Sequence, residues 1–218
     1  MANPFSLDPP FHSIPNHSDS NLCIMIMPQL FVFPIIVLIY IPPTLAMIAL
    51  EGPCPSNMTA VGDLDMDRFL GKWYTYSVYP TFSKRVPKCQ TVEFKKEEDK
   101  IWIKRTELST KTDTLKVKVE EIRNVDPSHG KYDLITTNSA FPEGIQINVL
   151  DTDYDNFAIR YMCFDSNNLF SFHWAVIQTR IRLPTSDIIY TAQVLARKSG
   201  IVLSKMIKIP QHSCPPDA

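Results

Sequence analysis

The pattern of hydrophobic and polar positions between residues 72 and 180 is typical of β-strands rather than helices. Apolar and polar residues alternate in short runs, and clusters of Gly, Pro, Asp, Asn and Ser separate one run from the next. Eight strands joined by short connections predict an all-β antiparallel meander that closes into a barrel or folds into a sandwich. The predicted strands are 72–79, 89–96, 101–108, 114–123, 131–137, 145–151, 156–163 and 169–180.

Alternation within a strand also predicts which side chains face the interior. The strand at 114–123 alternates Leu115, Val117 and Val119 with charged residues, so we expect the aliphatic side chains inside and the charged ones in water. The same reasoning groups the following residues on one face of their strands: Val92 and Phe94; Ile145, Ile147 and Val149; Phe170, Phe172, Trp174, Val176 and Gln178.

Helical signals flank the strands. Residues 65–70 begin with an acidic position and predict one short helical turn. After the strands, Thr185 or Ser186 is the expected N-cap of a single amphipathic helix, and Gly200 is its expected C-terminal stop. Residues 203–209 predict a final edge strand.

The first 49 residues differ from the rest of the 218-residue chain, because they contain no Lys or Arg. Residues 30–50 are almost all apolar, but three prolines interrupt the run, which favours a cleaved signal peptide over a membrane anchor. Ala46 and Ala49 end two candidate cleavage sites. We therefore divide the chain into a disordered N-terminal extension at 1–24, a hydrophobic signal peptide at 25–49 and a folded domain at 50–218.

Cysteine usage agrees with export. The four cysteines beyond the leader are consistent with two disulfides, for which three pairings are open; four buried thiols are the alternative. No Cys/His spacing predicts a metal site. Asn57 begins a glycosylation sequon. Beyond the leader, 22 basic residues nearly balance 21 acidic ones, so no nucleic-acid partner is expected.

Three short motifs make the chain resemble a lipocalin, in particular the branch with apolipoprotein D and the insect bilin-binding proteins. They are Gly71-Lys72-Trp73-Tyr74, Thr152-Asp153-Tyr154, and Arg180 at the end of the last barrel strand. Over residues 54–214, the resemblance implies an eight-stranded antiparallel up-and-down β-barrel, the calyx, with one C-terminal α-helix packed outside. It implies structural roles for the three motifs, with Arg180 stacked over Trp73 at the closed end. The implied disulfides are Cys54–Cys163 and Cys89–Cys214.

The resemblance also places Ala158, Arg160 and Met162 inside the barrel. A guanidinium in an apolar cup is costly unless it meets an anion. We therefore expect Arg160 to receive the carboxylate of a fatty acid or a bilin. The alternatives are an internal ion pair with Glu121 or Glu107, or a side chain that reaches solvent at the mouth.

The predicted ligand-binding residues form an aromatic and aliphatic cup around Arg160. Several of them could instead be plain core filling, since a barrel of this size can pack shut. Beyond Arg160, they are Tyr79, Phe82, Val92, Phe94, Val117, Val119, Ile147, Met162, Phe172, Trp174 and Val176.

The function that this resemblance implies is an extracellular carrier of a small hydrophobic ligand, such as a lipid or fatty acid, a bilin pigment, a pheromone or a hormone. No cofactor is expected apart from a bilin or lipid bound as ligand. A lipocalin with a closed cup that contacts proteins, for example a cell-surface receptor, is the second hypothesis. A lipocalin-type isomerase is the third, and the assignment of all four cysteines to disulfides argues against it. The oligomeric state is left open.

Overall fold

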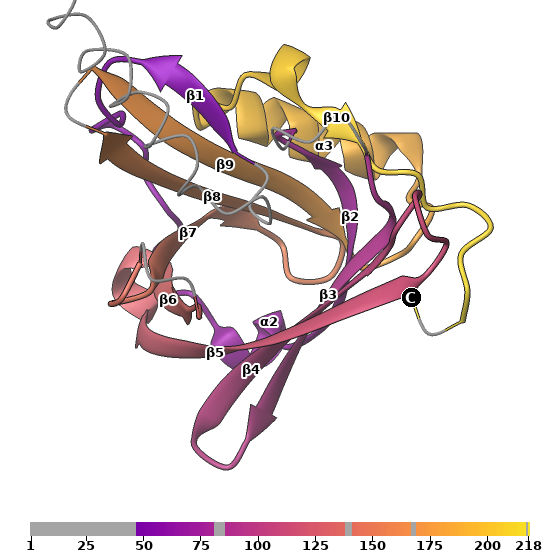
Figure 1. Cartoon of the computed structure of the whole chain (residues 1–218). Coiled ribbons are helices and arrows are strands. Elements are labelled where there is room, and N and C mark those ends of the chain that lie inside the picture. Colours follow the sequence, from indigo (N-terminus) through magenta and orange to yellow (C-terminus); the bar gives the residue numbers. More distant parts are fainter. Residues whose placement is uncertain (1–46, 81–85, 138–140, 167–168, 217) are drawn as a thin grey trace, which may run out of the picture. The chain divides into compact units, whose positions relative to one another are not determined.

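The computed structural model describes residues 47–80, 86–137, 141–166, 169–216 and 218 (Figure 1). The chain divides into two units, Met1–Ile41 and Pro42–Ala218, and the described residues belong to the second. The predicted extension at 1–24, most of the predicted signal peptide and Phe82 lie outside the described residues.

Eight strands form one antiparallel sheet in which each strand pairs with the next along the chain. The last of them pairs back with the first, which closes the sheet into a barrel (Figure 1). The predicted closed all-β barrel is therefore confirmed. The barrel strands are β2 (Gly71–Val78), β3 (Lys88–Glu97), β4 (Lys100–Leu108), β5 (Leu115–Asp126), β6 (Lys131–Ile135), β7 (Ile145–Thr152), β8 (Phe157–Ser166) and β9 (Phe170–Thr179).

Two further strands extend the sheet. β1 (Ile48–Glu51) pairs with the first half of β9, although its first two residues fall within the predicted signal peptide. Cleavage after Ala46 would leave β1 intact, whereas cleavage after Ala49 would shorten it. β10 (Ile207–Lys208) pairs with the end of β2.

The predicted edge strand at 203–209 is wrong over its first half. The segment begins with the 3₁₀ turn η2 (Leu203–Lys205), in which the N–H of Met206 donates to the carbonyl of Leu203. The two residues of β10 then pair with the sheet, and the N–H of Ile209 donates to the carbonyl of Tyr76 at 2.9 Å. A second 3₁₀ turn, η1 (Pro127–His129), connects β5 to β6.

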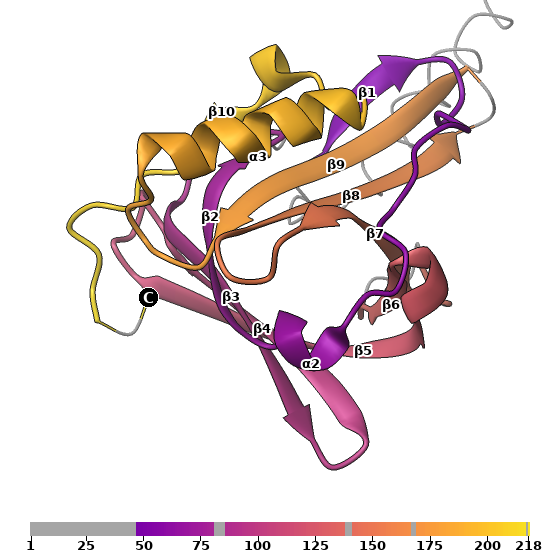
Figure 2. The same cartoon turned by 180° about the vertical axis from the view of Figure 1, so that it is seen from behind.

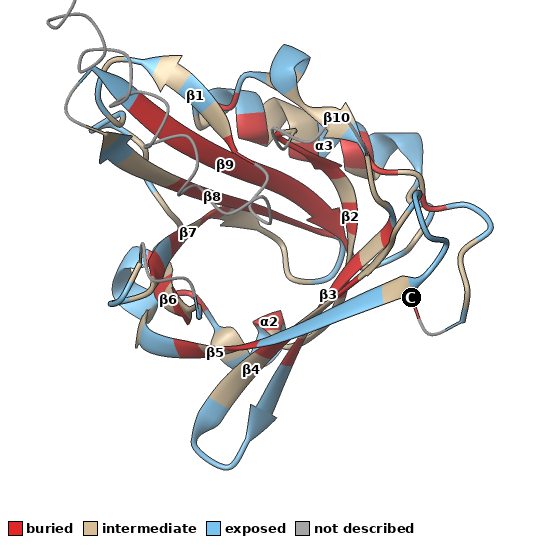
Figure 3. Ribbon diagram, viewed as in Figure 1, coloured by how far each residue is buried: buried red, intermediate tan, exposed pale blue. Residues whose placement is uncertain are grey.

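Helix α3 (Ser186–Lys198) packs against the outer face of β7, β8 and β9, as predicted (Figure 2). Thr185 is its N-cap, and Gly200 follows its end with φ +87°, a conformation that favours glycine. Figure 3 shows β8 and β9 buried along most of their length, because both of their faces are covered. The core between helix and sheet contains Tyr79, Leu150, Phe157, Ile159, Tyr161, Ala175, Ile177, Ala192, Ala196 and Ile201.

The closed end of the barrel is built on the predicted contact between Arg180 and Trp73. The guanidinium carbon of Arg180 lies 3.6 Å from the centroid of the Trp73 ring. The same guanidinium donates to the carbonyls of Leu70, Tyr154 and Arg68 at 2.7–2.8 Å. These bonds join the short helix α2 (Met66–Phe69) to the β7–β8 connection.

The remaining motif residues shape that connection. The Oδ1 atom of Asp153 accepts hydrogen bonds from the N–H groups of Asn156 and Phe157 at 2.8 and 2.9 Å. The hydroxyl of Thr152 accepts from the N–H of Tyr154 at 3.0 Å. The motif thus fixes a turn whose carbonyl at Tyr154 receives Arg180, which is a structural role.

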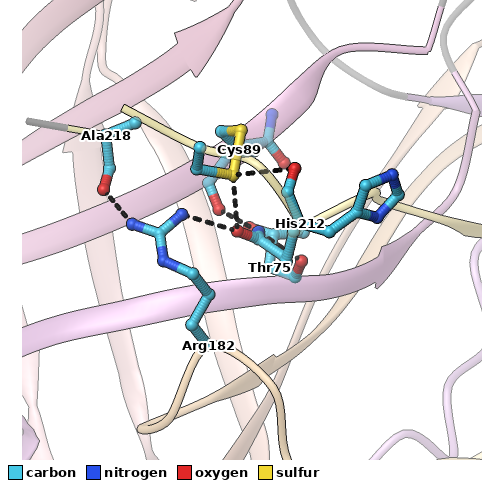
Figure 4. The surroundings of a disulfide bond; sticks show 8 residues. Thr75, Cys89, Arg182, His212 and Ala218 are labelled. Carbon is cyan, nitrogen blue, oxygen red and sulfur yellow. Dashed lines mark hydrogen bonds between the residues drawn. A yellow bond between two sulfur atoms is a disulfide. The ribbon is translucent and has the colours of Figure 1, made fainter. Parts of the chain in front are cut away.

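Both disulfides implied by the resemblance are present. Cys54–Cys163 ties the segment before α2 to β8, and Cys89–Cys214 ties the C-terminal segment to the start of β3. Next to the second bridge, the side-chain amide of Gln211 donates to the backbone carbonyls of Thr75 and Gln90 (Figure 4). The C-terminal segment is therefore fastened to the outside of β2 and β3.

Candidate ligand-binding cavity

A cavity of about 770 Å³ lies inside the barrel. This volume is within the range of small-molecule sites, so the described part of the barrel is not packed shut. Residues from β2, β3, β4, β5, β6, β7, β8 and β9 line the cavity. Six of the predicted ligand-binding residues are among them: Val92, Val117, Ile147, Arg160, Trp174 and Val176.

Arg160 occupies the cavity wall with only 3% of its surface exposed. Its Nε donates to Oε1 of Gln178 at 3.0 Å, and its Nη1 donates to the hydroxyl of Tyr132 at 2.7 Å. The guanidinium carbon also lies 5.2 Å from the ring centroid of Phe94 and 5.4 Å from that of Trp174. Burial lowers the pKa of Arg160, because charge is less stable away from water.

Every contact of Arg160 with the described residues is to a neutral group. Glu121 pairs with Arg123 and Lys100, and Glu107 accepts a hydrogen bond from Gln90, so neither expected carboxylate neutralises Arg160. The small exposed fraction also excludes a side chain that reaches bulk solvent at the mouth. The guanidinium thus faces the cavity without an anionic partner among the residues that the structure describes.

A second charged group on the cavity wall was not predicted. The Nη2 atom of Arg105 lies 2.5 Å from Oε2 of Glu120, and the Nζ atom of Lys118 lies 2.7 Å from the other oxygen of the same carboxylate. All three residues line the cavity, and Glu120 is 5% exposed. The wall formed by β4 and β5 is therefore ionic rather than aliphatic.

The predicted facing of β5 is wrong for Val119. In the observed register Glu120 lies opposite Ile103, which is 1% exposed, while Val119 is 58% exposed and lies outside the cavity. Val117 lies at the cavity rim with 52% of its surface exposed. Alternation predicted the correct period of β5 but assigned the wrong face of the strand to the interior. Charged side chains can point inward here because they form ion pairs with each other.

Tyr79 is also misplaced by the prediction, because β2 carries a β-bulge. Thr75 pairs with Gln178 and Ser77 with Ile177, so one residue of β2 is extra between these pairs. The bulge reverses the facing of the strand beyond it: Val78 lines the cavity, and Tyr79 packs in the core beneath α3.

Three more predicted wall residues are buried without lining the cavity. The Phe94 ring packs edge-on against Phe69 at 5.0 Å and lies between the closed end and Arg160. Met162 is 1% exposed and pairs across the sheet with Trp174. Phe172 stacks on Phe164 at 5.0 Å. These side chains fill the interior around the cavity.

Sequence reasoning missed several polar lining residues. Thr75 and Gln178 lie beside Arg160, and the Gln178 amide donates to the Thr75 hydroxyl at 3.4 Å. Alternation along the strand does place Gln178 on the same face as Trp174, because the two residues are an even number of positions apart. No group of His, Cys, Asp or Glu that could hold a metal ion occurs among the described residues.

A closed eight-stranded barrel with one outer helix and a ligand-sized cavity defines a small-molecule-binding class of protein. The chain belongs to the Lipocalin / cytosolic fatty-acid binding protein family, whose sequence profile matches residues 70–213. This confirms the resemblance drawn from the Gly71, Thr152 and Arg180 motifs.

Individual relatives agree with that assignment. Apolipoprotein D of Macaca fascicularis is 26% identical over 156 residues, which is 70% of this chain and 80% of the relative. Apolipoprotein D of Cavia porcellus is 25% identical over 170 residues, 75% of this chain and 85% of the relative.

Among solved structures, insecticyanin from the tobacco hornworm Manduca sexta has a TM-score of 0.64 at 20% identity, covering 78% of this chain and 91% of its own. Apocrustacyanin C1 has a TM-score of 0.62 at 19% identity, and the match covers 78% of this chain and 94% of the apocrustacyanin chain. At these identities the likeness shows the fold.

Proposed function

We propose that this protein is an extracellular carrier that binds a small hydrophobic anion in the barrel cavity. The observation that carries the proposal is Arg160, a buried guanidinium that lines the cavity and whose described contacts are all to neutral groups. An incoming carboxylate would supply the missing charge in a site shielded from water, where a charge-assisted hydrogen bond is strong.

The cavity wall beside Arg160 suits the hydrocarbon part of such a ligand. Trp174, Val176 and Ile147 provide aromatic and aliphatic surface, while Gln178 and Tyr132 hold the guanidinium in place. A fatty acid fits this arrangement, and the family name itself includes fatty-acid binding. A bilin carries carboxylates on an apolar frame and fits for the same reason.

Three observations support export from the cell. The two disulfides are typical of oxidising compartments. Asn57 of the predicted sequon lies in an exposed turn. The predicted signal peptide precedes the barrel, and none of the described helices is long and apolar enough to cross a membrane.

Binding of hexadecanoic acid and of its methyl ester tests the proposal, measured by displacement of a fluorescent fatty acid. The ester keeps the hydrocarbon but removes the charge, so we expect the acid to bind about ten-fold more tightly or better. Arg160→Met should abolish this difference, because it removes the charge and keeps an apolar side chain of similar length.

Arg197→Met is the matched control, since Arg197 is exposed on α3 outside the barrel. The control should retain the preference for the acid. Equal affinity of the unmodified protein for acid and ester would contradict an anion site at Arg160. Failure to bind either compound, or a tetrapyrrole such as biliverdin, would overturn the carrier function and favour a role in protein contact.

A further inference from the structure

The charge of the cavity wall exceeds what one carboxylate can balance. Among the residues that the structure describes, five cationic side chains line the cavity against two carboxylates, Glu107 and Glu120. If Arg160 receives one ligand anion, the β4–β5 wall still carries an excess of positive charge. Its cationic residues are Arg105, Lys111, Lys116 and Lys118.

Arg105 is the most constrained of these cations. Arg105 and Lys118 both form an ion pair with Glu120, so one negative charge balances only one of the two positive charges. The Nε atom of Arg105 is buried and has no hydrogen-bond partner in the described chain. A buried donor left unpaired destabilises the folded state. The Arg105 side chain therefore has both charge and hydrogen-bonding capacity available to a ligand.

Sheet register places Arg105 within the cavity rather than on the outer surface. It lies opposite Val92 on β3 and opposite Lys118 on β5, and all three residues line the cavity. The positive charge of Arg105 also lowers the pKa of Arg160, as expected for two cations that face one shared space. Two separate cationic positions, one on β8 and one on β4–β5, thus border one cavity.

We propose that the cavity is built for an amphiphile with two acidic groups, one bound by Arg160 and the other by Arg105 together with Lys118. The apolar middle of the ligand lies against Val92, Trp174 and Val176. This inference rests on the proposed carrier function and specifies its ligand class as a dianion. A monoanionic amphiphile would leave the second cationic position unused.

The test compares hexadecanedioic acid with its monomethyl ester and with hexadecanoic acid, by displacement of a fluorescent fatty acid at fixed ionic strength. We expect the diacid to bind at least ten-fold more tightly than its monomethyl ester. In a series of diacids from octanedioic to hexadecanedioic acid, affinity should peak at the chain length that spans the two positions.

Arg105→Met should remove the advantage of the diacid over its monomethyl ester, with both affinities measured in the same variant. Lys104→Met is the control, because Lys104 is the neighbour of Arg105 on β4 and lies opposite the exposed Val119. Lys118→Met is a second variant in case Arg105→Met fails to fold, and it should reduce the advantage of the diacid in the same direction.

Equal affinity for the diacid and its monomethyl ester would overturn the inference, and binding of hexadecanoic acid in the same assay would leave the carrier function standing. An advantage that survives in both Arg105→Met and Lys118→Met would also overturn it. If the unmodified protein binds none of the three compounds or biliverdin, the carrier function and the inference fail together.

Discussion

The hydroxyl of Tyr79 accepts a hydrogen bond from the backbone N–H of Val202 at 2.9 Å, on the outer side of the barrel. Tyr79 follows the end of β2, and Val202 follows α3. Tyr79 therefore connects the barrel wall to the segment that leaves the helix, and burial raises the pKa of its hydroxyl.

Tyr79→Phe should lower the stability of the fold and leave ligand binding unchanged. The substitution keeps the ring but leaves the Val202 N–H without its acceptor, at a cost of about 1–3 kcal/mol. Urea unfolding measures the stability, and fluorescent fatty-acid binding measures the affinity. Weaker ligand binding with undiminished stability would show that Tyr79 faces the cavity after all.

Arg180→Lys should be strongly destabilising, because lysine cannot reproduce a planar contact over Trp73 and several hydrogen bonds at once. Arg180 donates to the carbonyls of Leu70, Tyr154 and Arg68. Losing most of these bonds together with the ring contact should cost about 2–4 kcal/mol. The midpoint of urea unfolding should fall with little change in slope. Arg197→Lys on the exposed face of α3 is the control and should have no measurable effect.

Stability should fall as the pH drops below about 6.5, because of the buried His173. Its ring nitrogens lie 2.6 Å from the hydroxyl of Tyr161 and 2.8 Å from that of Ser171. Burial lowers its pKa below the ordinary value, partly offset by the charge of Asp165 and reinforced by Lys205. As the pH falls, His173 therefore becomes protonated in the unfolded chain at a higher pH than in the folded protein. The loss begins as the pH falls below the unfolded pKa and ends near the folded one.

The variant His173→Gln separates this effect from others. Glutamine offers a neutral amide to the neighbouring hydroxyls, so its stability should change less over the same pH range. Carboxylates affect stability at lower pH. The hydrogen bond from Thr185 lowers the pKa of Asp187, so the stability that Asp187 contributes is lost only below about pH 4. An identical pH slope in His173→Gln and the unmodified protein would contradict the assignment.

Expression of the full chain in a eukaryotic secretory system should yield a glycosylated protein in the medium. Asn57 and Thr59 of the sequon are both exposed. Digestion with a peptide N-glycosidase should increase its electrophoretic mobility, and Asn57→Gln should migrate like the digested protein. Retention of the unmodified chain in the cell would count against the extracellular carrier.

The sequence by itself determined the order and number of the barrel strands, the outer helix and the closed end. Periodicity is a local property, and each strand shows it within its own residues. The Asp153 motif fixes its own turn through local hydrogen bonds, whereas Arg180 bonds carbonyls 110 and 112 residues away in the sequence. Together, the motifs around Trp73, Asp153 and Arg180 identify the family. The family resemblance, carried over from the Thr152 motif, placed Arg160 inside the barrel.

Only the tertiary structure decided which face of β5 is inside and where Tyr79 points. Alternation has a period of two and cannot by itself distinguish the two faces. On β5 the register with β4 set the choice, and the Arg105–Glu120–Lys118 ion pairs made a charged interior possible. On β2 a β-bulge changed which residues beyond it face the interior, and the local sequence pattern did not predict this bulge. The ionic side of the cavity is thus a product of strand pairing, which no single strand shows in its own sequence.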